Sequence, residues 1–217
     1  MFEKDYLLRI IHQFVKSLAR VLFSIQSGNT EQARSEIQSA SEEFLGLPFD
    51  MILSLNNQSL SEILGIDGER SVEKSYIAAQ LLFCEASVRE AADETNATEL
   101  YLRSVNLLLG GFSLIDETLK SEAASTIDQI LLFLQHEELP LEICKQLVAY
   151  HELRGEYSSA EDRLFKLAAS ESPKALEIGV SFYERILSRT DHELERGNLP
   201  RSEVEEGLAE LRARFDS

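Results

Sequence analysis

Two widely separated segments of this chain share one spacing, and that spacing is typical of a helical hairpin. Residues 28–37 and residues 155–164 both read glycine, four residues, alanine, three residues and an aliphatic side chain. A glycine can end one helix in the left-handed conformation, and an alanine lets the next helix pack closely on the first. The chain is therefore expected to be built from helix pairs, with Gly28 and Gly155 among the packing residues of the two turns.

A third segment fits the same spacing in part. Residues 92–101 keep the alanine and the bulky residue but carry Ala92 in place of the glycine. The three alanines Ala33, Ala97 and Ala160 then stand 64 and 63 residues apart. That interval is close to two units of a helix pair of about 34 residues. We expect all three alanines to pack at helix crossings.

The rest of the chain predicts an all-α fold. Only four prolines and ten glycines interrupt it, and β-branched residues never alternate as they would in strands. Periodicity and turn residues predict helices over about 3–27, 30–45, 69–93, 96–109, 112–119, 121–137, 140–154, 157–170, 173–196 and 200–215. No linker separates the two halves, which favours a single helical domain over residues 1–217.

Residues 47–68 form an insert of a different kind. They predict two short helices that are broken at Asn56–Asn57, and Ser59 followed by Glu62 fits a capping box for the second. Such short helices commonly cover the end of a core.

The second hairpin resembles a tetratricopeptide repeat between Leu147 and Pro173. Gly155, Tyr157 and Ala160 fall where that repeat places its turn glycine, its aromatic residue and its small residue. The small residues expected near 148 and 167 are missing, and Thr30 replaces the aromatic residue in the first hairpin. The resemblance implies a tetratricopeptide-like, right-handed array of helical hairpins, and an irregular helical bundle is the alternative.

The whole chain also resembles a family of bacterial helical proteins of unknown function. The similar stretches are Asp5–Ile11 at the start and the Leu45–Leu47 turn. This resemblance implies a bacterial cytoplasmic protein with repeat-like helices, and it supplies no activity.

Charge and composition exclude several classes of partner. The formal net charge is −17, which disfavours nucleic acid and anionic lipid. Residues 1–26 are the exception, because they carry a balance of +2. Charged residues interrupt the N-terminal apolar positions, and no uncharged run reaches the length of a membrane span, so we expect a cytoplasmic protein without a membrane partner. Cys84 and Cys144 lie in apolar helical stretches, which predicts buried free thiols.

No catalytic or metal motif is found. The three His-Glu pairs at His136, His151 and His192 are followed, four residues after each histidine, by Pro140, Gly155 and Arg196, so none is a zinc helix. A di-iron motif needs glutamate three residues before a histidine, and those positions hold Arg9, Phe133, Val148 and Arg189. Gly110–Gly111 stands alone and fits a helix end. We therefore expect no enzyme activity, no cofactor, no metal and no catalytic residue.

The remaining polar and aromatic clusters are expected to be structural. The acidic pairs Glu42–Glu43, Glu137–Glu138 and Glu205–Glu206 lack the ligand pattern of a calcium loop and fit solvated helix faces. Phe182, Tyr183 and Tyr150 share helical spacing with aliphatic residues and fit the core, whereas His12 fits a boundary position.

The first helix, residues 1–27, is unusually apolar. Beyond its main stripe, Phe2, Leu7, Leu8, Val15 and Ala19 widen the apolar surface, so the helix must bury two faces. It either lies between neighbours inside the monomer or forms a homodimer contact. We favour the dimer, because terminal helices seldom become central.

These observations predict a non-catalytic scaffold of helix pairs that binds a protein or peptide partner. An acidic groove in such an array would prefer basic ligands. The alternative is a small-molecule sensor or enzyme, with a pocket where the short helices of residues 48–66 cover the helix at 69–93.

Overall fold

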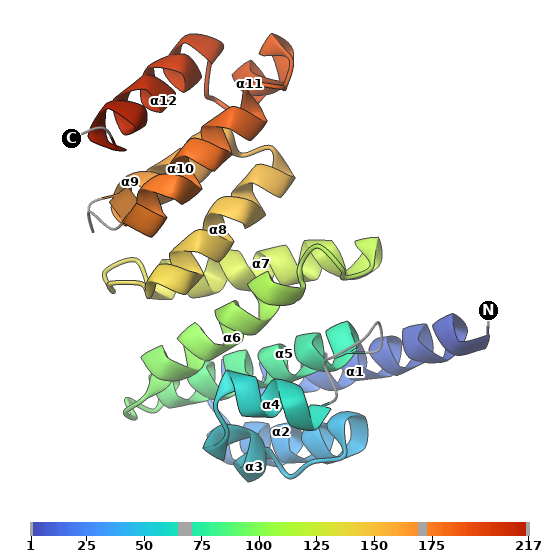
Figure 1. The fold of residues 1–217 in the computed structure, drawn as a ribbon. Coiled ribbons are helices and arrows are strands. Elements are labelled where there is room, and N and C mark those ends of the chain that lie inside the picture. Colours follow the sequence, from blue (N-terminus) through green and yellow to red (C-terminus); the bar gives the residue numbers. More distant parts are fainter. Residues whose placement is uncertain (1, 65–70, 169–172, 216–217) are drawn as a thin grey trace. The chain divides into compact units, whose positions relative to one another are not determined.

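The chain is folded into helices joined by short connections (Figure 1). The computed structural model describes residues 2–64, 71–168 and 173–215, and within these ranges it contains twelve helices and no strand. The helices are α1 (Phe2–Gln26), α2 (Thr30–Leu45), α3 (Phe49–Ser54), α4 (Asn57–Leu64), α5 (Ser71–Ala91), α6 (Ala97–Gly111), α7 (Glu117–Phe133), α8 (Leu141–Arg154), α9 (Tyr157–Ala168), α10 (Pro173–Ile186), α11 (Asp191–Arg196) and α12 (Arg201–Phe215). The all-α prediction is confirmed.

The helices fall into two compact units. Unit 1 covers Met1–Glu137 and contains α1–α7, and unit 2 covers Glu138–Ser217 and contains α8–α12. The boundary lies in the proline-containing connection before α8, where the sequence shows no linker composition. That both units form a single domain stays a prediction.

Helix α5 lies at the centre of unit 1. Every residue from 75 to 86 is buried, although a surface helix buries only one stripe. The covering helices are α1, α2, α4, α6 and α7, all of which pack against α5. The polar side chain of Gln80 is satisfied inside this core, because its amide donates to Thr126 Oγ1 on α7 at 3.0 Å.

A serine allows α6 to approach α5 closely. Ser104 is fully buried, and its hydroxyl donates to the Ala79 carbonyl oxygen at 2.8 Å. Ala97, which the spacing predicted to be the small packing residue of this pair, lies at the first turn of α6 and is only half-buried. The prediction for Ala97 is corrected: the crossing lies two turns further along the helix, at Ser104.

The other two hairpin turns have the predicted conformation. Gly28 and Gly155 both have φ of +71°, in the left-handed region. Ala33 and Ala160 are fully buried, as expected for residues at helix crossings. The two glycines are not packing residues, however, because a Cβ atom at either position would meet nothing within 4 Å. Their role is conformational.

Two helix boundaries differ from the prediction because local caps decide them. Residues 112–116 form a turn rather than a helix, and the Asp116 side chain accepts from the Thr118 amide and starts α7. The predicted helix 173–196 is divided into α10 and α11. Thr190 and Glu193 form a reciprocal capping box, which starts a new helix at Asp191.

The short helices α3 and α4 form where the insert was predicted, with the break at Leu55–Asn56. The cap of α4 differs from the prediction, because Asn56 Oδ1 accepts from the Ser59 amide at 2.8 Å and Ser59 lies inside the helix. Asn56 thus caps the free backbone amide of Ser59 at the start of α4, so the predicted capping box of Ser59 and Glu62 is wrong.

The core of unit 2 is formed by α8–α12. Helices α8 and α9 make the second predicted hairpin, and α10 packs against both α9 and α12. Its fully buried side chains include Ala160, Phe182, Leu194, Leu199 and Val204. The prediction that Phe182, Tyr183 and Tyr150 are core residues is confirmed, since all three are buried.

Candidate functional site

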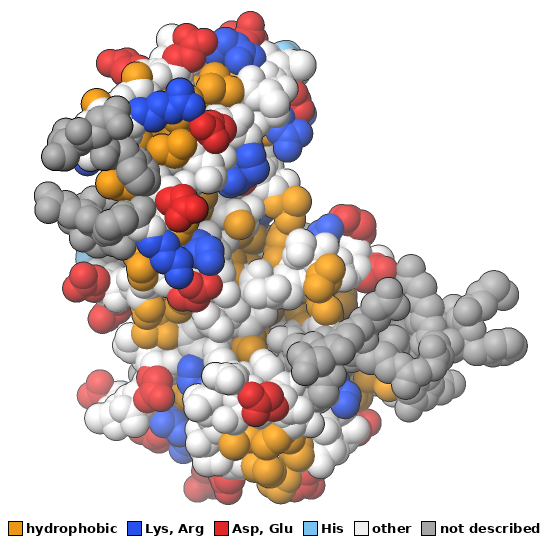
Figure 2. Space-filling view, in the orientation of Figure 1, with side chains coloured by type: hydrophobic (Ala, Val, Ile, Leu, Met, Phe, Trp, Pro, Cys, Tyr) orange, Lys and Arg blue, Asp and Glu red, His pale blue; other side chains and the backbone are white. Residues whose placement is uncertain are grey.

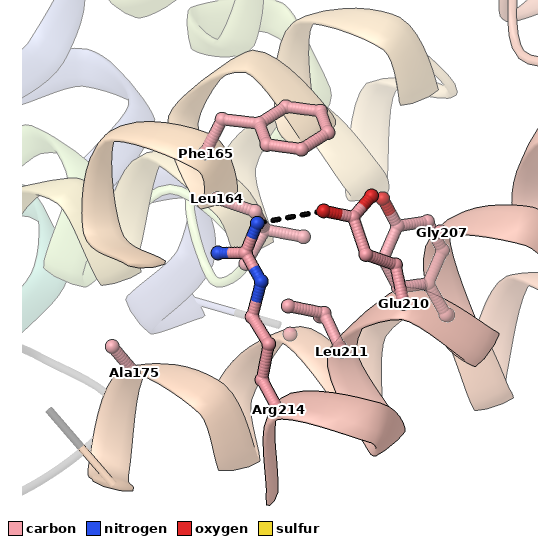
Figure 3. Close-up of a pocket in the computed structure, with 9 residues that line it drawn as sticks. Leu164, Phe165, Ala175, Gly207, Glu210, Leu211 and Arg214 are labelled. Atoms are coloured by element: carbon pink, nitrogen blue, oxygen red, sulfur yellow. Dashed lines mark hydrogen bonds and ion pairs between the residues drawn. The ribbon is translucent and has the colours of Figure 1, made fainter. Parts of the chain in front are cut away.

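Three helices of unit 2 converge around a shallow depression (Figure 3). Its walls come from α9, α10 and α12, and it is lined by Leu164, Phe165, Ala175, Gly179, Tyr183, Gly207, Glu210, Leu211 and Arg214. Two glycines make the close approach of α12 to α10 possible. A Cβ atom on Gly179 would come within 2.5 Å of Leu211 Cδ1, and one on Gly207 within 2.4 Å of the Tyr183 hydroxyl oxygen.

The depression is too small to enclose a metabolite. Its volume is about 10 Å³, which is the room of about one water molecule. Small-molecule sites are typically clefts of about 300–1,000 Å³. The depression therefore fits surface recognition better than small-molecule binding.

The rim combines an aromatic side chain with an ion pair. Phe165 is 51% exposed, and Figure 3 shows its ring on the α9 side of the Arg214 guanidinium. Arg214 donates to Glu210 Oε1 at 2.6 Å, so these two charged lining residues neutralise each other. The acidic groove expected from the sequence is not found at this depression.

The polar group beneath the depression is already satisfied. The Tyr183 hydroxyl donates to Glu161 Oε1 at 2.5 Å. Burial raises the pKa of Tyr183, and the adjacent Glu161 carboxylate raises it further. Burial also raises the pKa of Glu161, against the opposing effect of the hydrogen bond from Tyr183. This pair stabilises the packing of α9 on α10 and offers no free base.

A second polar cluster lies at the turn between α8 and α9. His151 is 8% exposed, and its Nδ1 lies 2.8 Å from Glu156 Oε2. Arg154 also contacts Glu156, at 2.7 Å. Burial lowers the pKa of His151, although the hydrogen bond to Glu156 opposes this shift. A neutral ring therefore donates from Nδ1 to the carboxylate.

The second nitrogen of this ring has no access to a substrate. His151 Nε2 is buried and has no hydrogen-bond partner. A general base must reach the proton that it removes, and this nitrogen is enclosed in the hairpin. The cluster orders the turn rather than forming a catalytic dyad.

An arginine on α6 ties the short helices α3 and α4 to their neighbour. From α6, Arg103 donates to the carbonyl oxygens of Ile52, Leu53 and Leu55 at 2.8, 3.0 and 2.6 Å, and to Asn57 Oδ1 at 3.4 Å. Burial lowers the pKa of Arg103. The guanidinium therefore holds the junction of α3 and α4, and the pocket considered between the short helices and α5 stays a prediction.

The predicted cysteine and acidic positions have the expected environments. Cys84 and Cys144 are free and buried, and burial raises the pKa of both thiols. The acidic pairs predicted as solvated faces are all exposed: Glu42–Glu43, Glu137–Glu138 and Glu205–Glu206.

Among the described side chains, no three His, Cys, Asp or Glu residues lie together as metal ligands would. No helix of the described ranges is long and apolar enough to cross a membrane.

Exposed apolar side chains are the main surface feature, and the sequence analysis missed most of them. On the face drawn in Figure 2, hydrophobic side chains form separate orange areas among charged residues. The large apolar side chains that are exposed are Phe23, Met51, Ile63, Leu114, Leu132 and Phe133 in unit 1, and Leu141, Leu153 and Phe165 in unit 2. Helical periodicity identified the buried stripes, and the apolar residues that lie outside those stripes were not assigned to a surface.

Comparison with protein-family models matches residues 1–216 to DUF6483, a family of unknown function. The chain belongs to this family. Comparison with curated proteins and with solved structures gave no match.

The DUF6483 match confirms the expected membership of a family of unknown function. Because no activity is described for DUF6483, the match carries no substrate, cofactor or catalytic residue to this chain. The bacterial source and the tetratricopeptide-like arrangement stay predictions.

Proposed function

We propose that this chain is a non-catalytic interaction protein, whose helix pairs present apolar contact surfaces to a protein or peptide partner. The observation that carries the proposal is that unit 2 exposes a large apolar side chain on its surface beside a depression too small for a small molecule. The aromatic ring of Phe165 is half exposed on a helix face, while the depression beside it has a volume of about 10 Å³, room for about one water molecule. Exposed anchors of this kind are typical of macromolecular contacts.

A tetratricopeptide-like organisation of the hairpins is part of this proposal. Its support is a repeated helix ending at residues 28, 93, 155 and 198. At each, the amide of the left-handed residue and that of the next residue bond back to carbonyls three and five residues earlier. At Gly28, for example, these bonds are Gly28 to Ile25 at 3.0 Å and Asn29 to Ser24 at 2.9 Å. This is the Schellman ending, which directs a chain from one helix into the next.

Basic partners are favoured by the overall charge. The net charge of −17 attracts cationic proteins and repels phosphate-rich ones. We also place the protein in the cytoplasm, where two buried free thiols are common.

Affinity capture tests the interaction. The wild-type chain is compared with a variant carrying Leu153→Ser and Phe165→Ser, which removes two exposed apolar side chains of unit 2 without opening its core. The matched control is Glu195→Ser with Arg196→Ser, two exposed polar positions of α11. We expect at least one bound protein, identified by mass spectrometry, to be recovered with the wild type and the control and lost with the apolar variant.

The same eluates distinguish the alternative function. A bound metabolite that is detected by native mass spectrometry and survives both substitutions, with no protein partner, would contradict the interaction proposal and support a sensor or enzyme.

We further propose that the chain forms a homodimer through α1. Helix α1 packs against α2 and α5. Among its side chains from Ile10 onward, Phe14 and Val21 are fully buried, yet Phe23 is 71% exposed. The side chains of Phe2, Leu7 and Leu8, which the sequence analysis placed on the second face, lie outside those described. Light scattering of the intact chain should give twice the monomer mass, and a monomer at high micromolar concentration would contradict the dimer.

A further inference from the structure

The exposed face of α1 is both basic and apolar. Lys16, Arg20 and Phe23 are spaced by four and three residues, which places them along one side of the helix, and all three are exposed. This helix is also the one with positive charge: residues 1–26 carry a balance of +2 within a chain of −17. Phe23 is thus a large apolar anchor beside two cations.

The α3–α4 surface has the opposite character. Met51 and Ile63 are 39% and 46% exposed, and each directly follows an exposed acidic residue, Asp50 and Glu62. Residues 35–69 contain seven acidic residues and no lysine or arginine. Figure 2 shows an orange area with red on several sides where Figure 1 places α3 and α4.

Two cations contact these short helices, but both donate to backbone carbonyl oxygens and neither pairs with Asp50 or Glu62 in these bonds. Arg103 donates to the carbonyl oxygens of Ile52, Leu53 and Leu55, as described above, and Lys74 Nζ donates to the Leu64 carbonyl oxygen at the end of α4 at 3.3 Å. The same bonds hold α3 and α4 in place. The α3–α4 surface is therefore an ordered acidic patch with apolar anchors.

The two surfaces do not cover each other within one chain. Both belong to unit 1, and both remain exposed there. We propose that α1 of one copy docks on the α3–α4 surface of a second copy, with Phe23 against Met51 and Ile63. The inference rests on the proposed homodimer and names the surface that α1 meets.

Charge complementarity favours this contact over a direct pairing of two α1 helices. An α1–α1 contact would place Lys16 and Arg20 near their own copies, whereas α1 on α3–α4 places them beside Asp50 and Glu62. In a two-fold dimer each copy donates its α1 and accepts the other's, so the contact occurs twice. The sulfur of Met51 also suits a position beside an aromatic ring.

The experiment uses two charge-reversed forms of the full chain. The α1 variant carries Lys16→Glu and Arg20→Glu, and the α3–α4 variant carries Asp50→Lys and Glu62→Lys. Each alone places like charges across both contacts of the dimer, so sedimentation equilibrium should show the dimer dissociation constant raised at least about tenfold.

Mixing the two variants is the decisive step. In the mixed dimer, the reversed α1 meets a reversed α3–α4 surface and the native α1 meets a native one, so both contacts are complementary again. We expect the mixture to return to a dimer of one copy of each, with a dissociation constant within a few-fold of the wild type. Circular dichroism of each variant, and the recovery itself, show that both remain folded.

A matched control and the salt response complete the test. Glu205→Lys with Glu206→Lys makes the same charge change as the α3–α4 variant at two exposed positions of α12, and it should leave dimerisation unchanged. Raising the salt from 0.1 to 1 M should weaken the wild-type dimer, because the screening length falls from about 10 to about 3 Å.

The outcomes separate the inference from the proposals beneath it. A dimer that persists in the α3–α4 variant would overturn the docking surface and leave the homodimer standing. A monomeric wild type would overturn both, while the affinity capture would still decide whether the chain binds other proteins.

Discussion

Replacing Arg103 should release the short helices from unit 1. Its guanidinium makes three bonds to carbonyl oxygens of residues 52–55 and a longer one to Asn57. A hydrogen bond to a charged group contributes about 1.5–3 kcal/mol, but the contributions are not additive, and water can reach carbonyls near the surface. Desolvation of the half-buried guanidinium also offsets part of the gain. We expect Arg103→Ala to destabilise the α3–α4 segment by about 3 kcal/mol.

Hydrogen exchange followed by mass spectrometry measures this effect locally, which matters because a chain with two compact units need not unfold in one step. A loss of about 3 kcal/mol corresponds to exchange that is roughly a hundredfold faster in the peptide covering residues 49–64. Arg103→Lys should have about half this free-energy effect, because an ammonium group cannot reproduce the planar fork of donors.

The control is Arg212→Ala, which removes an exposed arginine paired with Glu184 at 2.7 Å. An exposed ion pair contributes at most about 1 kcal/mol. If Arg103→Ala left exchange of residues 49–64 unchanged, or changed it no more than Arg212→Ala does, the carbonyl bonds would not be what holds α3 and α4.

Three further predictions concern packing, pH and thiol reactivity. Gly207→Ala should destabilise unit 2 by about 1–3 kcal/mol in thermal unfolding, because the new Cβ atom meets the buried ring of Tyr183. The control is Gly111→Ala, whose Cβ atom would lie 3.5 Å from its nearest neighbour, and which should be neutral or stabilising. The lowered pKa of His151 means that its contribution to stability is complete above the ordinary value of 6.5 and is lost as the pH falls toward the folded-state value. An NMR titration should find the ring neutral at pH 6.5, and a folded-state pKa at or above 6.5 would contradict this. Because burial raises the pKa of Cys84, a thiol reagent should modify it at the rate of unfolding only, and rapid labelling of the folded chain would show that it is accessible.

Much of the local structure could be predicted from the residues. The left-handed glycines at 28 and 155 ended their helices as expected, because few other residues adopt positive φ without strain. The buried alanines at 33 and 160 followed from the same spacing. The boundaries that were missed, at Asp116 and Thr190, depend on local capping bonds that compete with an otherwise continuous apolar pattern.

The candidate surfaces were much less predictable. Arg103 looks like any arginine on a helix, and its role depends on carbonyl groups about 50 residues earlier in the chain. Phe23 and Phe165 lie outside the buried stripes of their helices, and both are exposed, but the apolar pattern assigned neither to a contact surface. The wide apolar surface of the first helix was noticed, but the surface that it could meet was not.

The sequence alone determined the helical class, the turns and the acidic character of this protein, because these depend on local backbone preferences and on composition. The tertiary structure decided which helix is central, where α6 crosses α5 and which apolar side chains remain exposed. Those properties arise from contacts between distant residues: α5 is buried on every side only because five other helices cover it. Exposure is a property of the assembled fold, so the surfaces proposed for binding could be identified only after the helices were packed.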